Sequence, residues 1–164
     1  MTMPPRLLGL LLQVFRRLPQ RLRIAVVHLV GPSYSVGTVC VIERADGALL
    51  LCRHSYKQRW GFPGGLLNRG EEADHGARRE ALEEVGLDIE LLGEPHVVIE
   101  PHERRVDVIY RARPAAGVDP SRARPHPPEI VACEWFAPGE LPPLQAEAAG
   151  ALVALARAGD DHRR

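Results

Sequence analysis

The segment that most constrains how this chain can fold is GGLLNRGEEADHGARREALEEVGL, residues 64–87. Its second half has the composition of a helix, which we predict over residues 72–85. On that helix Glu80, Glu83 and Glu84 stand at positions i, i+3 and i+4, so their side chains share one face about one turn apart. Like charges this close repel one another, and the fold must place something positive beside them.

Two explanations of the three carboxylates follow from the residues alone. In the first, a hard divalent cation such as Mg²⁺ or Mn²⁺ binds between them, since such ions prefer oxygen ligands. In the second, the face is solvated, and Arg78 and Arg79 form ion pairs along the helix surface, each worth only about 0.3–0.5 kcal/mol. Both explanations stay open at this level, because acidic runs are common on ordinary helices.

The predicted helix also has an apolar stripe and a defined end. The stripe consists of Ala73, Ala77 and Ala81, with Leu82 and Val85 beside it. Small residues at four-residue spacing predict close packing against a sheet. Gly86 predicts the helix end, because glycine tolerates the left-handed conformation just past it. Before the helix, WGFPGG at residues 60–65 predicts a loop whose backbone closely approaches other groups.

Apolar and β-branched runs predict strands on both sides of this helix. They lie at about 36–44 and 48–54 before it, and at 96–102, 104–114 and 129–137 after it. Asp46-Gly47 predicts an antiparallel hairpin of the first two strands. Residues 115–128, rich in proline and arginine, predict a long loop, and residues 146–158 a last helix. This order predicts an α/β fold with a mixed sheet and helices on its faces.

Length, charge and cysteine content limit the class of protein. A chain of 164 residues fits one domain with a short appendage. Equal numbers of basic and acidic residues, 21 each, give no overall field that would attract the chain to a nucleic-acid duplex. Cys40, Cys52 and Cys133 lack disulfide or zinc spacing and lie in or beside apolar runs, so we expect small buried side chains and a cytoplasmic location.

The first thirty residues differ from the rest of the chain. They combine leucine and valine with arginine and contain no acidic residue. We expect an appendage, residues 1–30, that forms a helix broken near Pro19; it would pack on the domain, form a homodimer contact or, less favoured, lie on a membrane surface. Its apolar stretch is too short to span a bilayer, and no export signal follows. Residues 31–158 would then form the domain, and residues 159–164 a frayed tail.

The spacing of residues 65–87 is more specific than their charge. The fixed positions are Gly65, Glu71, Arg79, Glu80, Glu83, Glu84, Gly86 and Leu87, with Ala81 at a relaxed apolar position. This pattern resembles the Nudix box, G-x5-E-x7-R-E-U-x-E-E-x-G-U, where U is apolar. WGFPGG is similar to the usual entry into the box, and a looser resemblance covers residues 34–145. The appendage and the loop at 114–128 lie outside it.

The resemblance implies a fold, a cofactor and roles for the residues of the box. A Nudix-type α/β/α sandwich with a mixed β-sheet would hold Mg²⁺ or Mn²⁺. Glu83 and Glu84 would be the principal metal ligands and Glu80 a ligand or the general base. The Gly64 carbonyl would be a further metal ligand. Arg79 would orient Glu80 by a charged hydrogen bond. Glu71 would support the box from its first turn.

Residues outside the box complete the predicted site. The resemblance implies one more acidic ligand from a loop, for which Glu129 is our first candidate, before Glu134 and then Glu100 or Glu103. Four residues could contact substrate: Trp60 and Phe62 by stacking on a base, Tyr56 and Lys57 by reaching phosphate. For Trp60 and Phe62, core packing is the favoured alternative; for Tyr56 and Lys57 it is an ordinary polar turn. Arginines of 104–113 and 121–128 could bind terminal phosphates. The histidines His54, His96, His102 and His126 receive no role.

The function implied is Mg²⁺-dependent hydrolysis of a nucleoside diphosphate linked to another group. Metals neutralise the charge of a pyrophosphate and lower the pKa of bound water, which acidic residues alone cannot do. The alternative is a catalytically silent Nudix-fold module that binds a nucleotide or regulates a partner. Such a module would be expected to lose box glutamates, whereas this chain keeps them. The sequence does not select among nucleotide sugars, nucleoside triphosphates and related substrates.

Overall fold

The computed structural model describes residues 9, 13, 15–31 and 33–161, without the side chains of 158–161. The chain divides into two compact units, Met1–Tyr34 and Ser35–Arg164. In the first, helix α2 (Gln20–Val30) starts directly after Pro19, and residues 15–17 are helical before it. The break predicted near Pro19 is therefore confirmed. Among the residues described, no helix combines the length and the apolar character needed to cross a membrane.

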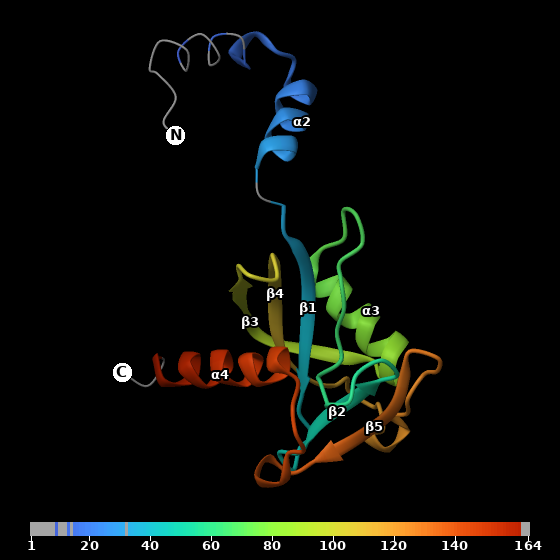
Figure 1. Ribbon diagram of the computed structural model, residues 1–164. Helices are drawn as coiled ribbons and strands as arrows, with labels where there is room; N and C mark the ends of the chain where they lie inside the picture. Colours follow the sequence, from blue (N-terminus) through green and yellow to red (C-terminus); the bar gives the residue numbers. More distant parts are fainter. Residues whose placement is uncertain (1–8, 10–12, 14, 32, 162–164) are drawn as a thin grey trace. The chain divides into compact units, whose positions relative to one another are not determined.

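The described part of the second unit is built on two small sheets and two α-helices, which Figure 1 labels. Strands β1 (Ser35–Ile42), β4 (Arg105–Pro114) and β3 (Ile89–Glu100) form one sheet in the order β1-β4-β3. β1 and β4 run parallel, and β4 and β3 antiparallel. Strands β2 (Leu49–His54) and β5 (Ile130–Phe136) form an antiparallel pair. With helices α3 (Ala73–Val85) and α4 (Ala146–Asp161), this confirms the predicted α/β fold with a mixed sheet.

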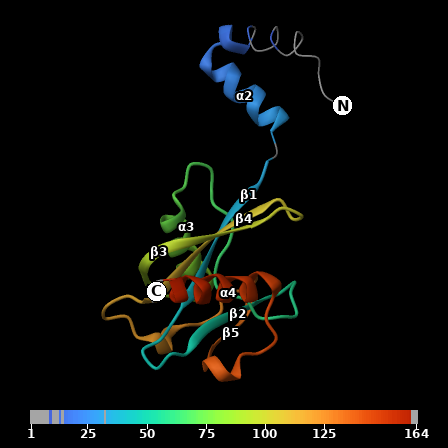
Figure 2. The same cartoon turned by 90° about the vertical axis from the view of Figure 1, so that its left-hand side faces the viewer.

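Alternate side chains of β1 enter two separate cores. Cys40 and Ile42 belong to the core beneath α3, whereas Val39 and Val41 belong to the core beneath α4. This alternation is the period-two pattern of a strand covered on both faces. Figures 1 and 2 show α3 and α4 against the sheet as separate layers. The result is an α/β/α sandwich.

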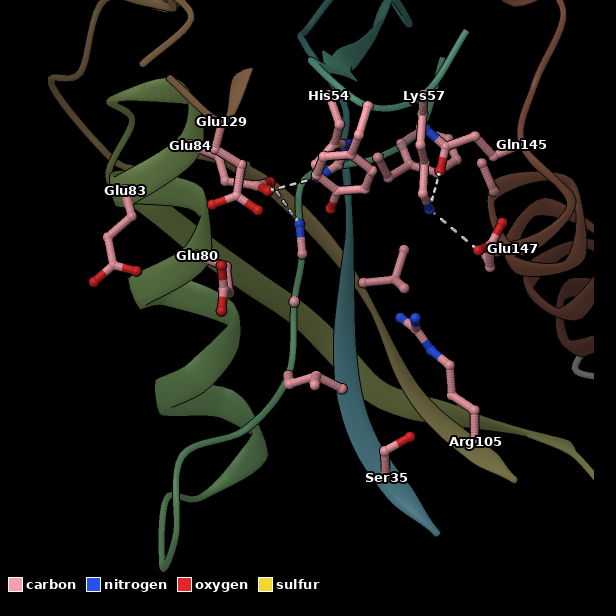
Figure 3. A pocket seen from close by; sticks show the side chains of 18 of the residues that line it. Ser35, His54, Lys57, Glu80, Glu83, Glu84, Arg105, Glu129, Gln145 and Glu147 are labelled. Atoms are coloured by element: carbon pink, nitrogen blue, oxygen red, sulfur yellow. Dashed lines mark hydrogen bonds and ion pairs between the residues drawn. The ribbon is translucent and has the colours of Figure 1, made fainter. Parts of the chain in front are cut away.

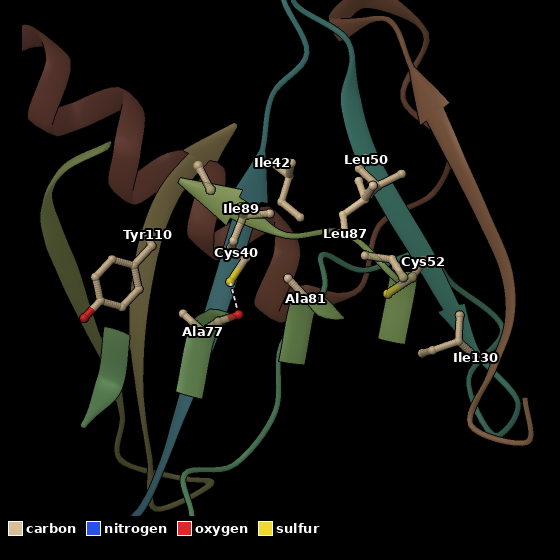
Figure 4. Close-up of a cluster of buried hydrophobic side chains, with 12 residues drawn as sticks. Cys40, Ile42, Leu50, Cys52, Ala77, Ala81, Leu87, Ile89, Tyr110 and Ile130 are labelled. Atoms are coloured by element: carbon tan, nitrogen blue, oxygen red, sulfur yellow. Dashed lines mark hydrogen bonds between the residues drawn. The ribbon is translucent and has the colours of Figure 1, made fainter. Parts of the chain in front are cut away.

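Helix α3 lies close to the sheet because its inner face is made of small side chains. Ala77, Ala81 and Val85 are fully buried, as Figure 4 shows for the first two. The Cys40 thiol donates to the Ala77 carbonyl over 3.2 Å, a contact that a bulky side chain on this face would prevent. The predicted alanine stripe is confirmed, but Leu82 beside it is exposed. Gly86 ends the helix at φ 68°, as predicted.

The predicted hairpin of the first two strands is wrong. The turn itself forms, with the Arg44 amide donating to the Ala48 carbonyl, but only one bridge, Glu43 with Leu49, joins the strands beyond it. β1 pairs instead with β4, starting at Ser35 opposite Arg105, and β2 pairs with β5. Asp-Gly specifies a local turn, whereas strand pairing depends on distant residues, and burial on both faces of β1 suits a parallel neighbour.

Two later elements differ from the prediction in extent. β3 begins at Ile89, before the run predicted at 96–102, and a register shift between Leu92 and His96 carries it past Gly93 and Pro95. Glycine and proline weaken regular strand pairing, and the irregularity accommodates them here. The predicted loop at 115–128 contains a short 3₁₀ helix, η1 (Pro120–Arg122). A second, η2 (Pro138–Glu140), follows β5.

The loop before α3 occupies the edge of β1 that β4 leaves open. The Cys40 amide donates to the Pro63 carbonyl and the Thr38 amide to the Gly65 carbonyl, both over 2.8 Å. Between them Gly64 has φ 154°, and a Cβ there would overlap the Thr38 carbonyl oxygen. This position therefore requires glycine. The sheet thereby fixes the start of the box backbone.

Candidate active site

With the exception of Glu71, the site residues predicted from the box line one pocket of about 720 Å³ (Figure 3). One wall is α3 with the loop before it and carries Glu80, Glu83 and Glu84; we name it the box wall. The facing residues come from the end of β2, the start of β4 and the start of α4; we name these the opposite wall. Its main members are Tyr56, Lys57, Arg105, Gln145 and Glu147. Segments far apart in sequence thus meet around one space.

Glu84 is the buried carboxylate of the box wall, with 5% of its surface exposed. Its Oε2 accepts the Gly64 amide over 2.9 Å, and its Oε1 lies 3.0 Å from Nε2 of His54. The Cys52 thiol approaches Oε2 at 3.9 Å. Burial raises the pKa of Cys52 well above its usual value, which keeps this sulfur a neutral thiol. Glu84 is therefore held from several sides and directed into the pocket.

Arg79 holds the other carboxylates of the box. Its Nη1 donates to Glu80 over 2.7 Å and to Glu83 over 2.9 Å, and its Nε donates to Glu71 over 2.8 Å. The predicted contact between Arg79 and Glu80 is thus present. The hydrogen bond from Arg79 and the Asn68 amide lower the pKa of Glu71 to about 2. Burial raises the pKa of Glu80, although Arg79 opposes this.

The three box glutamates do not gather around one point, in contrast to the prediction from their spacing. Arg79 supplies the positive charge between Glu80 and Glu83, whereas Glu84 turns away from it toward His54. A set of possible metal-ligand atoms within 4.8 Å of one another is formed instead by His54, Glu84 and Glu129. Helical spacing places side chains on a common face, but each rotamer follows the nearest partner.

The opposite wall presents two cations to these carboxylates. Lys57 donates to Gln145 over 2.8 Å and to Glu147 over 3.2 Å, which connects the loop after β2 to the start of α4. Arg105 donates from Nε to both oxygens of Asp107, at 2.8 and 3.0 Å. Figure 3 shows its guanidinium directed toward the middle of the pocket. These two basic side chains suit an anionic group on a ligand.

The predicted aromatic contacts divide into core and surface. Trp60 packs edge-on against Phe136, with ring centroids 5.0 Å apart, and is not among the residues lining the pocket. Phe62 is buried but does line it. Tyr56 is 68% exposed at the pocket and packs against His54. Stacking on a base therefore remains a prediction for Phe62, while Trp60 belongs to the core.

The candidates for an additional acidic ligand occupy different places. Glu129 lines the pocket beside Glu84, and Glu103 lines it from the turn before β4. Glu134 lies within β5 opposite Leu51, and Glu100 ends β3; neither lines this pocket. The first-ranked candidate, Glu129, is thus the one placed next to a box carboxylate.

Two of the three cysteines are buried as predicted, namely Cys40 and Cys52, and Cys133 is partly buried. Burial raises the pKa of Cys133 to about 12. Residues whose role the sequence did not reveal are His54, Gln145 and Glu147. The only signals were a histidine at the end of an apolar run, for His54, and two polar residues at the start of an alanine-rich helix, for Gln145 and Glu147. Both patterns are common on protein surfaces.

Comparison with known proteins assigns the family. The NUDIX domain model matches residues 33–156. A "MutT-like protein" of Streptomyces ambofaciens is 32% identical over 116 residues, 71% of this chain and 72% of that one. A "putative 8-oxo-dGTP diphosphatase" of Bacillus subtilis is 27% identical over 66% of this chain and 70% of that one. The crystal structure of a MutT NUDIX hydrolase from Burkholderia pseudomallei is 30% identical with a TM-score of 0.61, covering 74% and 98% of the two chains. The chain thus belongs to the Nudix family of pyrophosphate-bond hydrolases.

Proposed function

We propose that this protein uses a divalent cation, Mg²⁺ or Mn²⁺, to hydrolyse the diphosphate linkage of a nucleoside diphosphate derivative. One observation carries the proposal: the box carboxylates face Lys57 and Arg105 across a single pocket. A pyrophosphate needs cations on all sides, because its own charge is repelled by carboxylates. A metal ion on the box wall and two basic side chains on the other would meet that need.

The donor set of the box wall fits a hard divalent cation. Carboxylate oxygens of Glu80, Glu83 and Glu84 line the pocket, and Glu129 adds another. Such an ion supplies charge neutralisation and a bound water of lowered pKa. The Gly64 carbonyl remains a proposed ligand; its amide already fixes Glu84. Oxygen-rich surroundings of this kind match the preference of Mg²⁺ and Mn²⁺.

The residues around the metal ligands would position them. Arg79 keeps Glu80 and Glu83 in place by charge-assisted hydrogen bonds, and Glu71 fixes Arg79 in turn. Glu80, whose pKa burial raises, is suited to accept a proton from an attacking water. Arg105 and Lys57 would bind the phosphate or other anionic part of the substrate that lies away from the metal.

The test is a panel of nucleotide sugars, nucleoside triphosphates including 8-oxo-dGTP, and dinucleoside polyphosphates, each incubated with Mg²⁺ or Mn²⁺. We expect metal-dependent cleavage of at least one compound and its loss in Glu83→Gln. Glu72→Gln is the matched control, because it removes the same charge from an exposed position at the start of α3, outside the pocket. Nucleotide binding without any metal-dependent product would favour the silent binding module instead.

Three further predictions concern the whole protein and remain untested. They are a cytoplasmic location, a homodimer formed through residues 1–30, and the weaker alternative of contact between that segment and a membrane surface. Deleting residues 1–30 and measuring molecular mass in solution and sedimentation with anionic vesicles separates the last two. A change from dimer to monomer mass on deletion supports the dimer. Reduced sedimentation with the vesicles supports membrane contact.

A further inference from the structure

A buried histidine lies beside the carboxylates at the inner end of the pocket. The side chain of His54, the last residue of β2, is 8% exposed, and its Nε2 is 3.0 Å from Glu84 Oε1. Together with Glu129 these residues offer ligand atoms that all lie within 4.8 Å of one another. Figure 3 shows the three side chains arriving from β2, α3 and the segment before β5.

The β2–β5 ladder holds His54 and Glu129 next to each other. His54 is paired with Ile130, directly after Glu129, and the Ser55 amide donates to the Glu129 carbonyl over 2.8 Å. Glu84 is fixed separately by the Gly64 amide. The three groups are therefore placed by backbone structure and not by their contacts with one another alone, which is how a binding site is preorganised.

The two ring nitrogens of His54 differ in their surroundings. Nδ1 is buried and has no hydrogen-bond partner within the described part of the chain. Buried polar atoms are normally paired, so a histidine buried here needs a reason beyond packing. In the metal-free protein the contact with Glu84 makes Nε2 the donor, because a carboxylate can only accept; an ion bound at Nε2 would require the tautomer whose proton is on Nδ1. The lone pair of Nε2 would then be free for the ion.

The spacing and chemistry of the three groups fit one metal ion. With metal–ligand bonds of about 2.0–2.3 Å, two ligands of one ion lie at most about 4–4.6 Å apart, so three atoms within 4.8 Å of one another can reach a common ion with small side-chain adjustments. An imidazole nitrogen beside two carboxylates is a donor set that favours first-row transition metals over Mg²⁺, which binds oxygen almost exclusively.

We propose that His54, Glu84 and Glu129 form a mixed nitrogen and oxygen site, so that this protein prefers Mn²⁺ or a similar transition-metal ion to Mg²⁺. The inference rests on the proposed function, in which Glu84 holds the metal. It adds a nitrogen ligand from outside the box. A second acidic group, Glu72, Asp74 and His75, lies at the solvent-accessible start of α3 outside the pocket and serves as the comparison.

The test uses the full-length protein and Mn²⁺ alone. Electron spin echo spectroscopy detects the coupling of a directly bound ¹⁴N nucleus to Mn²⁺, and calorimetry gives the affinity. We expect nitrogen coupling in the unmodified protein, and its loss in His54→Gln together with about tenfold weaker Mn²⁺ binding and less than about twofold change for Mg²⁺. Glutamine can still donate to Glu84, so the variant removes the ligand and keeps the hydrogen bond. His75→Gln should keep both the coupling and the affinity.

Three outcomes overturn the inference. Mn²⁺ bound without nitrogen coupling would make His54 a positioning residue for Glu84 and leave the proposed function intact. Coupling that survives in His54→Gln but disappears in His75→Gln would place the ion on the surface group. Failure of the unmodified protein to bind any divalent ion would remove both this inference and the metal in the proposed function.

Discussion

The two walls of the pocket are built on different principles. The box wall consists of one continuous segment, residues 64–84, whose carboxylates are held by Arg79 and by the backbone of the same segment. The opposite wall is assembled from Lys57, Arg105 and Gln145, which belong to three different elements. In the proposed function the first wall would carry the chemistry, which depends on local spacing, and the second would carry recognition, which depends on the whole fold.

The strongest test of this contrast is Glu84→Gln in the box wall. Losing the charge of the buried carboxylate should lower kcat by about 1000-fold, because a metal contributes several kcal/mol of transition-state stabilisation. The glutamine carbonyl can still accept the Gly64 amide, so we expect the thermal unfolding midpoint to change little. Steady-state kinetics and thermal unfolding measure the two effects. Unchanged kcat would remove Glu84 from the chemistry.

Gly64→Ala tests whether the box wall depends on the sheet. The new Cβ would overlap the Thr38 carbonyl at a φ of 154°, so we expect a loss of about 2–4 kcal/mol in the free energy of unfolding. Gly70→Ala is the matched control, since Gly70 has φ 79° but no neighbouring atom within 4 Å of a Cβ. Equal losses in the two variants in urea unfolding would show that backbone strain alone matters.

On the opposite wall, Arg105→Ala should impair binding and not chemistry. Removing a charge-assisted contact to substrate should raise KM about tenfold, with kcat changed less than about twofold. Arg111→Ala provides the control, because Arg111 lies on the same strand, pairs with Glu43 and is not among the residues lining the pocket. A fall in kcat with constant KM would show instead that Arg105 takes part in the chemical step.

The smallest effect concerns acid stability of the box wall. Arg79 lowers the pKa of Glu71 from 4.5 to about 2 in the folded protein, so this pair stabilises the fold above pH 4.5. That contribution is lost as the pH falls toward 2. Glu71→Gln should therefore be less stable than the unmodified protein near neutral pH and lose less stability on acidification. Parallel pH dependences of the unfolding midpoint in the two proteins would contradict this.

The same contrast explains how much the sequence could predict. α3, its alanine face and the end at Gly86 follow from residues within one segment, and the structure confirms them. The pairing of β1 with β4 depends on residues that only the complete fold brings together, and the local Asp-Gly turn suggested a different partner. The local sequence offered His54 only a common pattern, because its partner Glu84 lies thirty positions further along the chain.

The loop that completes the edge of β1 has a consequence for how the pocket can move. The Thr38 and Cys40 amides donate to the carbonyls of Gly65 and Pro63. Any displacement of residues 63–65 therefore leaves these two β1 amides without their hydrogen-bond acceptors. The backbone at the start of the box and strand β1 should therefore open together or not at all. Equally slow deuterium exchange at the Thr38 and Cys40 amides would show this joint opening. The rigidity of the pocket would then be a property of the sheet.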